Sequence, residues 1–164
     1  ISKYTGNVKN PSTGNFSTGS YSLNKSLIKG EDLSREDEKI HHAIKNNATP
    51  VKTPFHAFSG TSRDFEHLAK NTKKGIFHSP AHISLSHCPK TAHQFSIGKT
   101  NEDRVKHIMH VHVQRGDKVF HIGKHSQMPD EHETVIPAGT KLKYSHSTQD
   151  DQHKIHHFKI HSQE

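Results

Sequence analysis

Two glutamates, Glu131 and Glu133, are separated by a single residue in the last third of the chain. In an extended segment, side chains two residues apart point to the same side, so both carboxylates can face one site. One carboxylate can then stabilise a developing positive charge while the other accepts a proton, provided that their surroundings separate their pKa values. The same spacing is also typical of a solvated strand face, and neighbouring motifs are needed to choose between these interpretations.

The histidines are the second group of residues that could do chemistry. The chain has 19 histidines, and His110 and His112 are expected on one face of a strand, which would suit Zn²⁺ or Ni²⁺. The other histidines occur at many spacings and without a His-Glu-x-x-His helix. The single cysteine, Cys88, excludes an intramolecular disulfide and zinc sites built on cysteine pairs. We therefore expect most histidines to be solvated and predict no metal site.

The charge of the chain favours an anionic partner. Lys and Arg number 23 against 16 Asp and Glu, a formal net charge of +7, and the histidines add positive charge as the pH falls through roughly 6.5. This balance suits nucleic acid, a nucleotide cofactor or an acidic protein, but charge alone does not choose among them.

The local patterns around these residues predict helices first and strands later, an α+β class. Apolar residues recur at helical spacing over residues 21–27 and 33–46, and Ser34 followed by Asp37 resembles a helix start. Residues 7–20, rich in Asn, Ser, Thr and Gly, predict a flexible loop or insertion. Further short helices are predicted at 63–71 and 89–95, and strands at 55–58, 76–77, 82–86, 105–113, 119–122, 134–136, 141–144 and 153–160.

The size of the chain predicts one domain, residues 1–164, because 164 residues leave little room for two cores. No run approaches the roughly 20 apolar residues that span a bilayer, so we expect a soluble protein without a membrane partner. The chain begins with Ile rather than Met, and we expect it to be cut from, or processed out of, a longer chain.

Four motifs resemble those of mono-ADP-ribosyltransferases and occur along the chain in the same order as in that family. Residues 126–142 resemble the family's segment in which a mobile loop leads into Glu-x-Glu, an apolar pair, a proline and a glycine turn. Residues 82–95 resemble its Ser-Thr-Ser strand and the helix that follows, with Leu85 replacing the middle Thr. Residues 4–6 and 21–27 resemble its opening Tyr-Thr-Gly and Tyr-x-x-Asn-x-x-Leu helix. Bacteriophage enzymes that modify host proteins look most similar, followed by secreted bacterial toxins.

This resemblance implies two roughly perpendicular β-sheets that form an NAD cleft, with helices on the amino-terminal side. It implies transfer of ADP-ribose from NAD to an arginine of a host protein, with release of nicotinamide. Glu133 would stabilise the oxocarbenium-like transition state, Ser84 would hold Glu133 by a hydrogen bond, and Glu131 would orient and deprotonate the acceptor. Ser86 and Phe95 complete the expected NAD site, with a structural role for Ser86 and a core position for Phe95 as the alternatives.

One position departs from the family pattern. The family's first strand normally ends in Arg-Gly, whose guanidinium binds the phosphates of NAD, whereas Ser59 and Gly60 stand here. A serine hydroxyl offers at most one weak hydrogen bond, whereas the charged guanidinium of arginine can donate two parallel hydrogen bonds to a phosphate. We expect Ser59 and Gly60 to line the NAD site and Arg63 or His56 to supply the charge.

The leading hypothesis is therefore a monomeric enzyme that acts on a host bacterial protein from a phage virion or within the host cytoplasm, with a secreted toxin as the second choice. A second hypothesis is a catalytically weakened transferase fold that serves as a basic module for binding nucleic acid or protein, which salt-dependent DNA binding would reveal. A third is a phage structural protein whose histidine-rich surface binds metal.

Overall fold

The computed structural model describes residues 7–9, 16–61, 63–70, 72–87, 106–122, 133–150 and 152–163. Nine strands of this part form one mixed sheet, in the order β3-β8-β9-β6-β4-β7-β11-β10-β5. Only β7 and β11 are parallel; the other neighbours in this sheet are antiparallel. The strands span β3 (Thr49–Pro50), β4 (Phe55–Thr61), β5 (Ile76–His78), β6 (Ile83–Ser86), β7 (Lys106–Val113), β8 (Lys118–His121), β9 (Glu133–Ile136), β10 (Lys141–Gln149) and β11 (His153–Ser162).

Helices α2 (Gly19–Lys29) and α3 (Arg35–Asn47) confirm the two helices predicted near the amino terminus. Ser34 caps α3 by accepting a hydrogen bond from the Asp37 backbone N–H at 3.1 Å, and acidic residues occupy the first turn. Ile40 and Ile44, one turn apart, are buried together with residues of α2, β8 and β9. This apolar cluster holds both helices against one face of the sheet.

The opposite face of the sheet forms the main core. In β7, the buried Met109, Val111 and Val113 alternate with the half-buried His110 and His112, as the period of two predicts. The buried core residues come from both halves of the sheet, because Leu85 and Ile136 share a cluster with Val111 and with Phe158 of β11. The α+β class and the main strands are confirmed.

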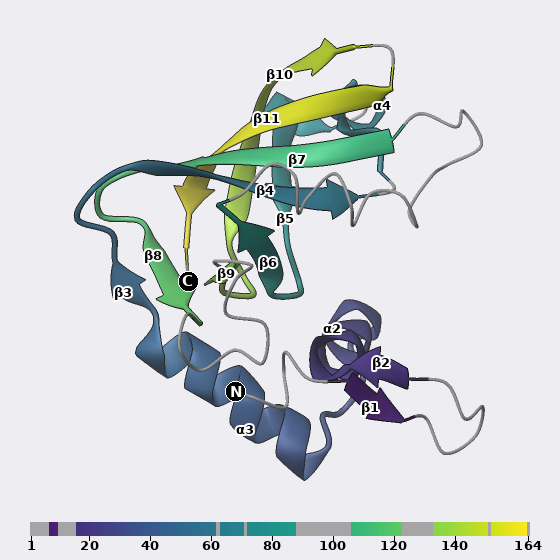
Figure 1. Cartoon of the computed structure of the whole chain (residues 1–164), viewed down its shortest axis with the longest axis vertical. Helices are drawn as coiled ribbons and strands as arrows, with labels where there is room; N and C mark the ends of the chain where they lie inside the picture. The colour runs from purple at the N-terminus through teal and green to yellow at the C-terminus, as the bar shows by residue number, and fades with distance from the viewer. Residues whose placement is uncertain are drawn as a thin grey trace.

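The two expected sheets are joined into one ladder. A single register pair, Phe58 with Ser86, connects β4 to β6 and so links the two halves. In Figure 1, β4, β7 and β11 lie nearly level, β6 and β8 below them are steep, and α2 and α3 lie at the lower end of the molecule. The arrangement therefore keeps the crossed halves that the resemblance implies, with continuous hydrogen bonding between them.

Two local predictions need correction. The composition of residues 7–20 predicts a loop, but β1 (Asn7–Lys9) and β2 (Phe16–Thr18) pair as antiparallel strands, and α2 already begins at Gly19. Backbone hydrogen bonds form such a pair without an apolar pattern, so the composition does not reveal it. The helix predicted over 63–71 is only α4 (Phe65–Ala69), with the 3-10 turn η1 (Lys73–Gly75) after it.

Within the described residues, we find no helix with the length and apolar character needed to cross a bilayer.

Candidate active site

A row of polar and aromatic residues crosses six strands on the face that also carries the two helices. Residues directly opposite each other on neighbouring strands project to the same face of a sheet. Glu133 begins β9, and Val135, two residues later, packs against the helices on this face. The register pairs that build the row run in the order Glu133, Ser86, Phe58, His110, His157 and His146.

The structure brings Glu133 together with both serines predicted for the site. Ser86 is the register partner of Glu133, and Ser84, which pairs with Val135, lies two residues away on the same side of β6. Glu133 is half-buried and Ser86 is only 5% exposed. The family motif predicts Ser84 against the carboxylate, whereas the register puts Ser86 directly opposite and Ser84 on the diagonal. A half-buried carboxylate beside two hydroxyls can stabilise a positive charge that develops on a bound ligand.

The structure does not bring Ser59 to this row. Ser59 pairs with Met109, whose side chain lies in the main core, and the Ser59 hydroxyl donates to the Gly60 carbonyl at 3.4 Å. Gly60 is buried opposite Ile108. Arg63 follows β4, is exposed, and its backbone N–H donates to Thr61 Oγ1 at 3.2 Å. The expected hydroxyl of Ser59 therefore points away from Glu133.

Two further predicted residues, Glu131 and Phe95, lie outside the described residues.

Beyond Phe58 the row becomes a chain of imidazoles. His56 Nδ1 lies 2.7 Å from His110 Nε2, and His110 Nδ1 lies 2.8 Å from His157 Nδ1. The Phe58 ring stacks on His110 with the ring centroids 4.7 Å apart. A second row beside it contains His56, His112, Lys159 and Lys143. Strands β4, β7, β10 and β11 contain no acidic residue, so this face attracts anions.

The imidazoles at the centre of this face are neutral near pH 7. Burial, reinforced by the neighbouring His157 and His56, lowers the pKa of His110 to about 4. Burial also lowers the pKa of His157, with His146 and His56 adding to the effect. An anion bound beside these rings would raise their pKa and draw in protons.

His82, for which the sequence predicts no role, fixes the start of β6. Its Nδ1 accepts from the Ala138 N–H at 2.9 Å, its Nε2 lies 2.8 Å from His41 Nδ1, and its backbone N–H donates to Asn24 Oδ1 at 3.0 Å. Because the Ala138 N–H can only donate, the ring proton of the neutral His82 sits on Nε2 and points to His41. His82 thereby ties α2, α3 and the turn before β10 to the strand that carries Ser84. Asn24, in the Tyr-x-x-Asn-x-x-Leu motif, is the only sequence signal for this arrangement.

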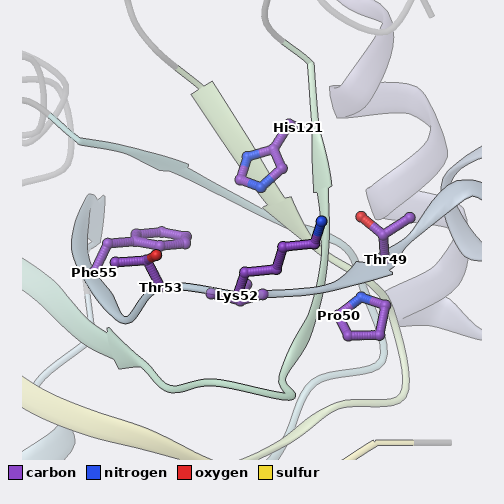
Figure 2. Close-up of a pocket in the computed structure, with 7 residues that line it drawn as sticks. Thr49, Pro50, Lys52, Thr53, Phe55 and His121 are labelled. Carbon is purple, nitrogen blue, oxygen red and sulfur yellow. The ribbon is translucent and has the colours of Figure 1, made fainter.

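A pocket of about 360 Å³ lies elsewhere (Figure 2). Its lining comes from β3 and the connection after it, including Lys52, from Phe55 at the start of β4 and from His121 of β8. His121 pairs with Thr134, which projects from β9 on the side opposite to Glu133. The pocket is therefore not part of the Glu133 row.

No protein-family model matches the sequence, and a search of curated proteins finds no match.

Solved structures of ADP-ribosyltransferases share the fold. The Vis toxin from Vibrio splendidus is 15% identical, with a TM-score of 0.61 over 87% of this chain and 69% of that one. Exoenzyme S from Pseudomonas aeruginosa, solved with human 14-3-3 protein beta and carba-NAD, is 20% identical, with a TM-score of 0.63 over 84% and 64%. An ADP-ribosyltransferase from Clostridium botulinum is 14% identical, with a TM-score of 0.66 over 84% and 78%.

These enzymes are longer than the present chain, and the similarity to bacteriophage enzymes stays a prediction. The crossed sheet, the two helices and the order of the motifs nevertheless agree with the resemblance inferred from the sequence. This chain has the fold of the mono-ADP-ribosyltransferase toxins.

Proposed function

We propose that this chain is a mono-ADP-ribosyltransferase that transfers ADP-ribose from NAD to an arginine of a target protein. The observation that carries the proposal is the position of Glu133 opposite Ser86, in a chain with this fold. The partner would be a protein of the host, and the Glu-x-Glu pattern at Glu131 and Glu133 supports arginine as the acceptor.

In the proposed transfer reaction, Glu133 and Glu131 have different roles. When bound, NAD supplies ADP-ribose by breaking its bond to nicotinamide through an oxocarbenium-like transition state. The Glu133 carboxylate stabilises the positive charge on the sugar, and the hydroxyls of Ser84 and Ser86 on the same face orient it. Glu131 orients the acceptor guanidinium and takes up the proton that it loses.

The residues on this face fit the chemical groups of NAD. Glu133 suits the ribose cation, while His56, whose Nδ1 faces His110 Nε2, can direct its Nε2–H to the diphosphate without an acidic neighbour in β4 or β7. The Phe58 ring, stacked on His110, adds a flat apolar surface. With the protons that a bound anion draws to this face, these histidines would replace the charged group that Ser59, directed to the core, does not provide.

Replacing both His56 and His110 by Gln is expected to weaken NAD binding by roughly 10- to 100-fold, because the charge-assisted hydrogen bond from His56 to the diphosphate and the His110 ring that orients His56 are lost. The affinity of the wild type should also rise as the pH falls from 7.5 to 6, because the bound anion raises a pKa of His110 that is about 4 in the free protein. Isothermal titration calorimetry with NAD at several pH values measures both effects.

The matched control is His78→Gln, which changes an exposed histidine on the distant strand β5 and should leave NAD affinity and its pH dependence unchanged. An unaltered affinity in the His56→Gln, His110→Gln double variant would show that other groups bind the diphosphate.

Arginine specificity is tested with agmatine, a small guanidine that is bound in a solved structure of Vis. The wild type should release nicotinamide and form ADP-ribosyl-agmatine. Glu131→Gln should lower the transfer to agmatine much more than the hydrolysis of NAD, because only transfer needs the guanidinium to be deprotonated. Chromatography of both products measures the two rates in one reaction.

Equal losses of transfer and hydrolysis in Glu131→Gln would contradict the role of Glu131. Salt-dependent binding of random DNA, together with no binding of NAD, would instead support the basic binding module.

A further inference from the structure

A second cluster of titratable side chains lies on the face of the sheet opposite to Glu133. Asp64 immediately precedes α4, while His107 is on β7 and His156 on β11. His107 is 1% exposed and His156 is fully buried. One potential ligand atom from each of the three residues lies within 4.8 Å of the other two. The tertiary structure thus gathers two imidazoles and a carboxylate from three distant segments.

We propose that Asp64, His107 and His156 bind a divalent transition-metal ion, with Zn²⁺ as the best fit. Two imidazole nitrogens and one carboxylate oxygen form a donor set that zinc accepts, with a fourth position left for water.

The spacing of the nitrogens is close to that of a zinc site. His107 Nδ1 lies 2.9 Å from His156 Nε2. Bonds of 2.0–2.1 Å in a tetrahedral zinc site place two ligand atoms about 3.3 Å apart. The two rings therefore need to separate by only about 0.4 Å to admit the ion, which small side-chain rotations provide.

A second layer of hydrogen bonds orients His156 for this role. His156 Nδ1 lies 2.8 Å from Ser147 Oγ, which in turn lies 2.7 Å from the Tyr144 hydroxyl. Metal-binding histidines usually donate their other ring N–H to an oxygen in this way. With its proton on Nδ1, His156 directs the Nε2 lone pair toward His107. His107 offers its own Nδ1 lone pair when its proton sits on Nε2.

The surroundings favour a neutral ligand and a bound cation. His156 is fully buried, and burial favours the neutral imidazole that a metal ion requires as its ligand. The Phe65 ring packs against His156 in a T-shaped contact, with the centroids 5.6 Å apart, and helps to hold the imidazole in place. Lys154 pairs with Asp64 at 3.2 Å and with Glu66 at 2.6 Å, so two carboxylates face one ammonium. Asp64 can therefore turn toward the ion while Lys154 stays in its ion pair with Glu66.

The ion would tie the segment after β4 to β7 and β11. Its role is structural, because the site lies on the reverse face from Glu133, and it does not depend on the proposed transfer of ADP-ribose.

The test uses the full chain stripped of metal with EDTA. Zn²⁺ titrated into the wild type should bind with one tight site per chain, and a hundredfold excess over the Kd should raise Tm by roughly 5–10 °C. Co²⁺ in the same site should give the visible absorption of a low-coordinate nitrogen and oxygen site. Asp64→Asn should weaken binding by at least about 100-fold, because a ligand is lost, while Asn can still cap α4 at His67.

A control variant tests whether histidines outside the proposed site bind the Zn²⁺ ion instead. The His56→Gln, His110→Gln double variant alters the imidazole chain on the opposite face and should keep the tight site. The proposal is overturned if the wild type binds no Zn²⁺ tightly, or if Asp64→Asn binds it unchanged. Loss of the site in the double variant would equally overturn it, because the ion would then be bound by surface histidines. His107→Gln, with its folding checked by circular dichroism, gives an independent loss of one ligand.

Discussion

Glu133→Gln is expected to lower the rate of nicotinamide release from NAD by roughly 10³-fold, because glutamine keeps the shape of the side chain but removes its negative charge. The carboxylate stabilises the transition state more than the ground state, so the loss should appear in kcat rather than in the affinity for NAD. Glu133 is half-buried at the start of β9, and the substitution should leave Tm nearly unchanged. Single-turnover measurements of nicotinamide release give the rate.

The control is Glu38→Gln, which changes an exposed glutamate of α3 that pairs with His42 at 3.7 Å. This variant should keep the wild-type rate. If Glu133→Gln releases nicotinamide as fast as the wild type, then Glu133 is not the catalytic residue and the proposed function fails with it.

His82→Leu is expected to lower the free energy of unfolding by about 2–4 kcal/mol at pH 7.5. The substitution removes the acceptor of the Ala138 N–H, and Ala138 is only 7% exposed, so a buried donor is left unpaired. It also removes the ring contact to His41 of α3. Urea denaturation monitored by circular dichroism measures the difference.

The same residue makes the wild type less stable in acid. Burial is the main cause that lowers the pKa of His82 to about 3 in the folded state, with His41 and Lys45 adding to it, whereas the unfolded value is near 6.5. The unfolded chain therefore binds more protons between pH 6.5 and about 3, and stability falls as the pH drops through this window. His82 alone should reduce the free energy of unfolding by about 1.4 kcal/mol between pH 7.5 and 5.5.

The acid effect should be smaller in His82→Leu by that amount, because the variant has no imidazole to protonate at this position. Exposed His78 again serves as the matched control, and His78→Gln should reproduce both the stability and the pH dependence of the wild type. If His82→Leu lost as much stability in acid as the wild type, other groups would account for the destabilisation.

Features that depend on residues close together along the chain could be predicted before the fold was known. Ser34 and Asp37 start α3 because a capping hydrogen bond spans only three residues. The alternation from Met109 to Val113 predicts β7 because side chains alternate between the faces of a strand. The local motifs around Ser84 and Glu133 likewise identified two residues that the fold places on adjacent strands.

Features that depend on the register between distant strands become visible only in the folded chain. The pairing of Phe58 with Ser86 directs Ser59 to the core and aligns His110 with Glu133, and a slip of one residue would reverse these directions. The cluster of Asp64, His107 and His156 was equally hidden, because its members are 43 and 49 residues apart, with 107 − 64 and 156 − 107 giving these separations. Sequence patterns report local geometry, whereas contacts between distant residues arise only when the whole sheet packs.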